Sequence, residues 1–233
     1  MPISWQFEFH EEVESTQDLV RAKPDAVEGY SVSAARQTKG RGRFGNKWVS
    51  ETGNLYTSFL LKPREPKTDW GQYGFALSLA VFDTVKELGP AAEFIQIKWP
   101  NDVLVNGKKI AGILLEAHDE NIIVGIGLNI ASPPEAGIGL QDVTSETLGF
   151  TSVQRVLYTA LGNNIAILRK EGFATVRTRW LQYAAFLGQN IKVRLPESTI
   201  EGIFTNINEQ GALALRLPDG AEKLITSGEI FGM

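Results

Sequence analysis

The segment from residue 94 to residue 130 is the part of the sequence that most restricts the fold. Between the second and third of its four strand-like runs lies the pair Asn106-Gly107. Asn-Gly is a strong signal for a two-residue hairpin, because both residues tolerate the positive φ angles that such a turn requires. Strands that follow one another through short turns pair antiparallel. The segment therefore predicts a mostly antiparallel sheet with strands at Phe94–Trp99, Val103–Val105, Lys109–Glu116 and Asn121–Ile130.

The flanking sequence predicts further strands and several helices. Alternating or continuous apolar residues predict strands at Trp5–His10, Tyr30–Ala34 and Leu55–Leu61. Apolar residues at helical spacing predict helices at Glu14–Arg21, Tyr73–Leu88, Val153–Arg169 and Phe173–Phe186. The first of these helices has Ser15 or Thr16 as its N-cap candidate. The pattern indicates an α+β fold, in which helices flank a mixed, mostly antiparallel sheet.

The character of the chain changes at Leu187-Gly188. From there short strands recur, separated by turns at Gly211 and at Asp219-Gly220, which is typical of a small β-barrel. The predicted strands are Ile191–Leu195, Thr199–Asn206, Ala212–Leu217 and Ala221–Thr226. We therefore expect a large domain over residues 1–187 and a small one over residues 188–233, which leans on the first for stability.

Composition excludes several classes of protein. The 233 residues contain no cysteine, so disulfides, thiolate metal sites and a cysteine nucleophile are ruled out. The net charge of −4 is unfavourable for a general nucleic-acid binder. The first residues lack the pattern of a signal peptide, and no apolar stretch approaches membrane-spanning length. These features predict a cytoplasmic protein.

A glycine-rich basic loop follows the second predicted strand. Residues 36–48 contain five Lys or Arg residues, and no acidic residue lies between Gly29 and Ser50. The loop matches neither the dinucleotide motif, because a strand and not a helix follows it, nor a P-loop, because Trp48 stands where Ser or Thr should bind magnesium. Glycines and guanidinium groups nevertheless suit an anionic ligand. We expect a loop that lacks apolar anchors and is mobile when empty, in which Trp48 either stacks on a base or packs into the core.

Two further segments carry polar residues at strand ends. Lys98-Trp99-Pro100-Asn101-Asp102 joins two predicted strands, and the Asn-Gly hairpin can bring Asp102 next to Lys109 on the neighbouring strand. Gly112 indicates a close backbone approach. In the strand that ends at Asn129, the two glycines are explained by strand packing, and Asn129 is the better functional candidate.

These segments together resemble the biotin–protein ligase family. The resemblance rests on the G-R-G-R-x-G-x-x-W loop, the K-W-P-N-D segment with its downstream K-K-x-x-G-I-L, and the G-x-G-x-N strand. Ser15-Thr16-Gln17 matches the family's Ser-Thr-Asn/Gln element of the biotin pocket, with Gln where Asn is commoner. The tail from Gly188 to Glu229 is similar to the family's C-terminal SH3-like barrel. The matching motifs begin at residue 15, so the resemblance points to the monofunctional form without an N-terminal DNA-binding domain.

The resemblance implies a reaction in two steps and a set of residues for it. Biotin and ATP form biotinyl-5′-AMP, which then passes biotin to a lysine of a partner protein; Mg²⁺ arrives with ATP, and no all-protein metal site is implied. Lys109, Asp102 and Arg43 are the implied catalytic residues. Arg41, Arg43 and Lys109 are implied to stabilise charge on the α-phosphate, Thr16 and Gln37 to bind biotin, Trp48 to cover the adenylate, and Asn129 to contact its phosphate or ribose. The implied ligand-binding residues are Ser15, Thr16, Gln17, Gln37, Gly40, Arg41, Gly42, Arg43, Gly45, Trp48, Lys98, Asn101, Lys109, Gly112 and Asn129.

The implied partner is a biotin carboxyl carrier protein or domain of a biotin-dependent carboxylase. We expect no specific DNA binding and no membrane association, and both a monomer and a homodimer remain open. Two other functions share part of this pattern. A lipoate–protein ligase shares the fold and the adenylation chemistry, but the Arg-Arg-x-x-Gly-Gly-Gly loop of that family is absent. A nucleic-acid-binding module would use the basic loop and the barrel, but the barrel carries many acidic residues.

Overall fold

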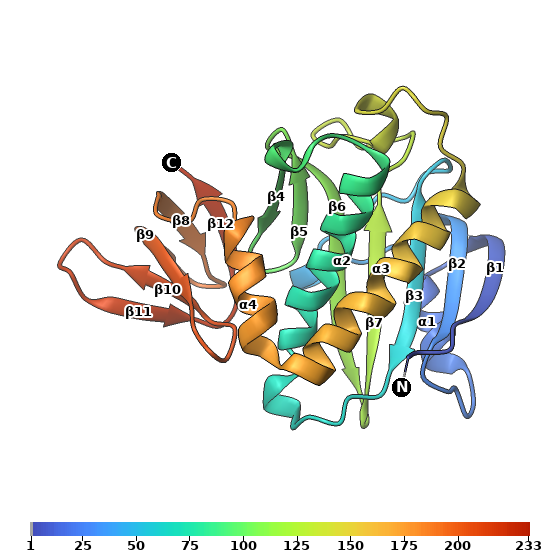
Figure 1. Cartoon of the computed structure of the whole chain (residues 1–233), viewed down its shortest axis with the longest axis horizontal. Helices are drawn as coiled ribbons and strands as arrows, with labels where there is room; N and C mark the ends of the chain where they lie inside the picture. Colours follow the sequence, from blue (N-terminus) through green and yellow to red (C-terminus); the bar gives the residue numbers. More distant parts are fainter. Residues whose placement is uncertain (1) are drawn as a thin grey trace.

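The computed structural model describes residues 2–233 and contains two β-sheets (Figure 1). The larger sheet has seven strands in the order β1-β2-β3-β7-β6-β5-β4. In this sheet β1 pairs parallel with β2, and every other neighbouring pair is antiparallel, which confirms the predicted mixed, mostly antiparallel sheet. Its strands are β1 (Gln6–Val13), β2 (Tyr30–Gln37), β3 (Leu55–Leu61), β4 (Ile95–Lys98), β5 (Asp102–Val105), β6 (Lys108–His118) and β7 (Asn121–Leu128).

The predicted hairpin joins β5 to β6. Asn106 and Gly107 have φ angles of 51° and 74°, as the turn requires. The register slips by one residue between Val103 and Leu104, so that Asp102 lies opposite Gly112 whereas Leu104 lies opposite Lys109. Lys109 is an odd number of residues from Gly112, and regular alternation would direct its side chain to the other face. The bulge therefore turns Lys109 onto the same face of the sheet as Asp102.

Helices cover both faces of the large sheet (Figure 1). One face packs against α2 (Gln72–Leu88) and α3 (Phe150–Glu171), and the main hydrophobic core lies between them and the sheet. The short α1 (Thr16–Ala22) covers part of the other face, where Val20 packs into a small separate cluster with Val32, Leu60 and Ile123. Because α1 is short, it does not cover this second face near β5 and β6, and the glycine-rich loop lies over that part of the sheet.

The second sheet has five antiparallel strands in the order β11-β10-β9-β8-β12. They are β8 (Asn190–Arg194), β9 (Thr199–Ile207), β10 (Leu213–Arg216), β11 (Glu222–Ile225) and β12 (Glu229–Gly232). Four of them were predicted, and β12 was missed because only four residues near the chain end form it. The helix before this sheet, α4 (Phe173–Gln182), ends four residues earlier than predicted.

The second sheet docks beside the Lys98–Asp102 segment. The Trp99 indole donates a hydrogen bond from Nε1 to the carbonyl oxygen of Gly211, at 3.3 Å, and Gly211 lies against the ring of Phe75 on α2. One-turn 3₁₀ helices complete the structure at Arg43–Gly45, Lys67–Asp69, Ala92–Phe94 and Leu140–Asp142. Within residues 2–233, no helix is both long enough and apolar enough to cross a membrane.

Candidate active site

A cleft opens on the α1 face of the large sheet, between the sheet, α1 and the glycine-rich loop. It encloses about 890 Å³ of space that is continuous with solvent. Most of the residues selected from the sequence line it. They are Thr16, Gln17, Gln37, Arg41, Gly42, Arg43, Trp48, Lys98, Asn101, Asp102, Lys109 and Gly112.

Four of the selected residues lie outside the lining: Ser15, Gly40, Gly45 and Asn129. Asn129 is buried, and its amide donates to the carbonyl oxygens of Lys109 (3.3 Å) and Ile138 (3.1 Å), so it holds the Lys109 backbone in place. Gly40 is needed because a Cβ there would lie 2.5 Å from the Trp48 carbonyl oxygen. Ser15 occupies the N-cap position of α1 without a side-chain hydrogen bond.

One end of the cleft is polar but uncharged. The Oε1 atom of Gln37 accepts hydrogen bonds from the Thr16 backbone N–H (2.9 Å) and from the Thr16 hydroxyl (3.0 Å), so Gln37 supplies the cap that Ser15 does not. The Thr16 hydroxyl also pairs with that of Ser58, at 2.7 Å, and Gln37 Nε2 donates to Ser50 at 3.0 Å. These side chains therefore hold one another in fixed positions before any ligand arrives.

Gln17 adds an unpaired donor to this end. Its side chain lies on Gly125 of β7, where a Cβ would come within 2.8 Å of Gln17 Cδ. The residue is only 4% exposed, and its Nε2 atom is buried without a hydrogen-bond partner among residues 2–233. A buried donor without a partner is costly, so a ligand that places an acceptor here would relieve that cost.

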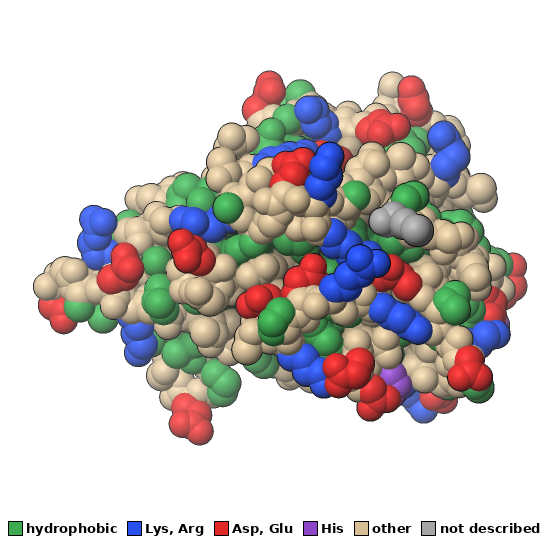
Figure 2. Space-filling view, turned by 60° about the horizontal axis from the view of Figure 1, so that its bottom comes forward, with side chains coloured by type: hydrophobic (Ala, Val, Ile, Leu, Met, Phe, Trp, Pro, Cys, Tyr) green, Lys and Arg blue, Asp and Glu red, His purple; other side chains and the backbone are tan. Residues whose placement is uncertain are grey.

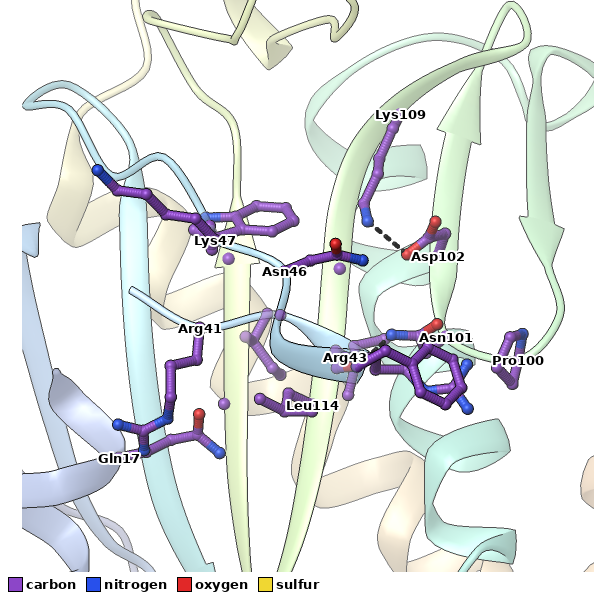
Figure 3. Close-up of a pocket in the computed structure, with 18 of the residues that line it drawn as sticks. Gln17, Arg41, Arg43, Asn46, Lys47, Pro100, Asn101, Asp102, Lys109 and Leu114 are labelled. Atoms are coloured by element: carbon purple, nitrogen blue, oxygen red, sulfur yellow. Dashed lines mark hydrogen bonds and ion pairs between the residues drawn. The ribbon is translucent and has the colours of Figure 1, made fainter. Parts of the chain in front are cut away.

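The other end of the cleft is charged. Asp102, whose side chain is 10% exposed, lies 2.7 Å from the Nζ atom of Lys109 (Figure 3). It also lies 3.6 Å from the Nζ atom of Lys98. The Asn101 amide donates to the carbonyl oxygen of Ile113, at 2.6 Å, and fixes the turn against β6. The predicted proximity of Asp102 and Lys109 is confirmed, and the Asp102 carboxylate is close to the amino groups of both Lys98 and Lys109.

Arg43 joins the loop to the second sheet. Its guanidinium donates a hydrogen bond to the carbonyl oxygen of Gly228, at 3.0 Å. Burial lowers the pKa of Arg43, and the carboxylates of Asp102 and Glu229 oppose that shift. Glu229 belongs to β12 and lines the cleft. No local feature of the sequence marked it as a site residue, because it reaches the cleft only through the docking of the second sheet.

Arg41 lies apart from the charged end. Figure 3 shows its side chain next to Gln17, away from Lys109 and Asp102. Its guanidinium donates to both carboxylate oxygens of Asp18, at 2.7 and 2.8 Å. The two arginines that the resemblance implies at the α-phosphate therefore have different partners here: Arg41 pairs with an acidic residue of α1, and Arg43 bonds to the second sheet.

The floor of the cleft is made of glycines. Gly112 lies opposite Gly127 across β6 and β7, and Gly125 follows on the same face. The Trp48 indole lies on this floor, where a Cβ at Gly127 would come within 2.4 Å of Trp48 Cε2 and a Cβ at Gly112 within 2.8 Å of Cζ3. The expectation of a loop without apolar anchors is therefore wrong, because Trp48 packs its end against the sheet. The signal for Gly125 and Gly127 was their spacing of two, which puts both on one face of a strand.

We expect Gly127→Ala to destabilise the protein by about 1–3 kcal/mol, the usual cost of overpacking, because the new methyl group would displace the Trp48 ring. Urea unfolding measures the change. Trp48→Ala in the same background should recover most of the loss. Gly74→Ala, in α2, is the control, since a Cβ there would make only an ordinary contact, at 4.0 Å from Leu115 of β6. Equal stability of Gly127→Ala and the wild type would show that the indole does not rest on this glycine.

The surface charges are mixed. Figure 2 shows Lys and Arg side chains interspersed with Asp and Glu over the face that it presents, and not gathered into a continuous basic patch. Ion pairs extend to the start of the loop, where Arg36 pairs with Glu12 at 2.6 Å and Lys39 with Glu14 at 2.7 Å. Binding to a phosphate backbone relies on clustered cations, so this arrangement disfavours the nucleic-acid-binding alternative.

Comparison with known proteins agrees with this site. The model of the biotin/lipoate A/B protein ligase family matches residues 11–130, and the model of the biotin protein ligase C terminal domain matches residues 186–232. The chain is 38% identical to the biotin--[acetyl-CoA-carboxylase] ligase of Paracoccus denitrificans, over 86% of this chain and 89% of that protein. It is 30% identical to the bifunctional ligase/repressor BirA of Bacillus subtilis, over 94% of this chain and 72% of that protein.

A solved structure agrees over nearly the whole length. The biotin protein ligase from Aquifex aeolicus, in complex with biotin and ATP, superimposes with a TM-score of 0.87 at 31% sequence identity. The match covers 97% of this chain and 99% of that one. With a family model over half of the chain and a relative at 38% identity, this chain belongs to the biotin/lipoate A/B protein ligase family.

Proposed function

We propose that this protein is a biotin–protein ligase: it activates biotin with ATP to biotinyl-5′-AMP and transfers biotin to a specific lysine of a biotin carboxyl carrier protein. The observation that carries the proposal is the two-ended cleft, with an uncharged polar end at Thr16, Gln17 and Gln37 and a charged end at Lys98, Asp102 and Lys109. Biotin has the same two-ended character, with a neutral ureido ring at one end and a carboxylate at the other.

The uncharged end suits the ureido ring. Thr16, Gln37 and Ser58 are locked together by hydrogen bonds, so their orientation costs nothing further when a ligand binds. Gln17 offers the buried Nε2 donor that lacks a partner among the described residues. We assign these side chains to recognition of the ureido ring.

The charged end suits the first chemical step. A carboxylate oxygen of biotin attacks the α-phosphorus of ATP, the bond from that phosphorus to the bridging oxygen breaks, and pyrophosphate leaves. Two anions must approach each other, and preorganised cations reduce that repulsion most in the transition state. We assign this role to Lys109, which the bulge in β6 directs into the cleft, together with Arg43 on the loop.

In the second step the ε-amine of the acceptor lysine attacks the acyl carbon of the mixed anhydride, loses a proton, and AMP leaves. No covalent bond to the enzyme is required, in keeping with a chain that lacks cysteine. Asp102 is the buried carboxylate of the charged end, and we assign it to orienting either the acceptor amine or a magnesium ion. Trp48, at the edge of the loop, is assigned to covering the adenylate.

The cleft is compatible with magnesium carried by ATP. Two of its lining residues are acidic, Asp102 and Glu229, and Mg²⁺ commonly takes one or two carboxylates and completes its shell with substrate phosphates and water. Residues 2–233 contain no group of three or more His, Asp or Glu side chains placed to hold a metal ion by themselves. Bound there, Mg²⁺ would supply charge neutralisation on the phosphates.

The names of the relatives support biotin over lipoate and suggest the acceptor. The Paracoccus relative is named for its action on acetyl-CoA carboxylase, and we propose the biotin carboxyl carrier of that enzyme as the partner here. We also infer two domains, residues 1–187 and 188–233, because the second sheet begins at Asn190 and the second family model starts at residue 186.

Exchange of labelled pyrophosphate into ATP tests the proposed function. We expect exchange only when biotin is present, because its carboxylate is the attacking group. Parallel reactions with lipoate and octanoate, followed by mass spectrometry of the acyl-AMP, identify the acid that is activated. Exchange without biotin, or with lipoate in its place, would overturn the proposal.

A further inference from the structure

Four charged side chains form a closed ring beside the Gln17 side of the cleft, and Arg41 is the one of the four that lines the cleft. Asp18 and Arg21 come from α1, Glu116 from β6, and Arg41 from the glycine-rich loop. Arg41 makes a two-point contact with Asp18, at 2.7 and 2.8 Å, and its NH2 atom lies 3.5 Å from Glu116. Arg21 bridges the same two acids, at 2.7 Å to Asp18 and 2.6 Å to Glu116. Cations and anions therefore alternate around the ring.

The charges of this ring balance one another. It holds two guanidinium groups and two carboxylates, so Arg41 presents little net positive charge to an approaching anion. Its hydrogen bonds hold the pKa of the Asp18 carboxyl below its ordinary value, so Asp18 is ionised and engaged at neutral pH. At the charged end, Asp102 pairs with Lys98 and Lys109, and Figure 3 shows Arg41 away from Asp102.

The ring connects the glycine-rich loop to α1, so it can restrict the position of the loop. Arg41 follows Gly40 and precedes Gly42, so the main chain on either side of it offers little conformational resistance. Within the loop, the Trp48 N–H donates to the Gly40 carbonyl oxygen at 3.0 Å, and the Gly42 N–H to that of Asn46 at 2.7 Å. These bonds shape the loop but do not tie it to the rest of the protein. The contact with Asp18 ties this part of it to α1.

We infer that Asp18 is a positioning residue for the adenylation reaction: it fastens the loop to α1 through Arg41, and Arg41 acts by placing the loop and not by direct contact with the ligand phosphates. The inference rests on the proposed function for the reaction that it affects. Because both carboxylate oxygens of Asp18 accept hydrogen bonds from the Arg41 guanidinium, the pair fixes the orientation of the Arg41 side chain as well as its distance from α1. Asp18 thereby sets how the loop closes over the cleft, with Arg43 holding the loop at its far side.

Asp18→Asn tests this inference, because it keeps the shape of the side chain and removes its charge. We expect the KM for biotin to rise roughly fivefold, in keeping with about 1 kcal/mol for a well-aligned pair near the surface, with a smaller change in kcat. Hydrogen exchange of the backbone amides of residues 39–48 should become faster. Asp18→Glu retains the charge and should restore most of both properties.

Glu14→Gln is the matched control. Glu14 pairs with Lys39, at 2.7 Å, on the same loop, but both side chains are about two-thirds exposed and neither belongs to the ring. The same loss of one negative charge is expected to leave KM and amide exchange unchanged. Equal behaviour of Asp18→Asn and Glu14→Gln would overturn the inference.

A double-mutant cycle with Arg41→Gln separates positioning from direct contact. If Arg41 acts through Asp18, the two single variants should show the same defect and the double variant should be no worse than either. A much larger loss in Arg41→Gln, or a lower KM in Asp18→Asn because the arginine is set free, would assign Arg41 to the ligand and overturn the inference. Amide exchange of the ligand-free protein is independent of activity, so failure of the proposed function would leave this measurement able to decide.

Discussion

Replacing Lys109 by alanine is expected to slow formation of biotinyl-5′-AMP roughly 100- to 1,000-fold, the loss of about 2.7–4 kcal/mol that follows removal of one preorganised donor to a transition-state charge. The Nζ atom of Lys109 lies 2.7 Å from Asp102 at the charged end of the cleft. Stability should change little, because the side chain is 39% exposed and Asp102 keeps Lys98 as a partner. Single-turnover adenylation and urea unfolding measure the two effects separately.

Lys108→Ala provides the control for this variant. Lys108 is the neighbouring residue on the same strand, it is exposed, and it does not line the cleft. Removing the same charge one residue away should leave adenylation near the wild-type rate. Near-normal adenylation by Lys109→Ala would instead limit Lys109 to a structural pair with Asp102.

Replacing Arg43 by glycine is expected to release biotinyl-5′-AMP roughly 10- to 100-fold faster, since a hydrogen bond from a charged group contributes about 1.5–3 kcal/mol. The variant loses the bond to the Gly228 carbonyl oxygen and also gains backbone freedom in a loop that already contains three glycines. Free adenylate reacts with exposed amines, so a bystander protein such as albumin should become biotinylated. Labelling of albumin, probed for biotin, measures the escape.

Arg43→Lys keeps the charge and should hold the adenylate better than the glycine variant does. The residues of the uncharged end are untouched in both, so adenylation should persist in part. If the glycine variant still makes adenylate but labels albumin no more than the wild type does, Arg43 has no part in retaining the intermediate.

The elements with strong local signals were predictable from the sequence. Leu55–Leu61 is a mostly apolar run of strand-forming residues, and its predicted bounds are those of β3. Asn106-Gly107 fixed the hairpin and brought Asp102 near Lys109. The bulge that turns Lys109 onto the correct face was not predictable, because it depends on the register of two strands and not on residue type.

Contacts between distant residues account for most of what was missed. Arg43 and Gly228 are 185 residues apart, and Arg41 and Asp18 are 23 apart, and neither pair leaves a pattern in the sequence. Asn129 is a polar residue at the end of a glycine-containing strand, and this local pattern suggested a ligand contact. Its amide nitrogen instead donates hydrogen bonds to two backbone carbonyl oxygens, which no local pattern indicates. Local sequence identified which residues are chemically capable, and tertiary packing decided which of them face the cleft.

The hydrogen bond from Arg43 to Gly228 means that mutations in the small domain can affect the loop over the cleft. The acceptor is a backbone oxygen, so no change of side chain at residue 228 can delete it. Only its location can change, and that location is set by how the second sheet sits on Trp99 and Phe75 through Gly211. The covalent link keeps this acceptor at a high effective concentration near the loop. A substitution inside the small domain that changes its position on the large domain would therefore speed release of the ligand, although the substituted residue does not contact the ligand.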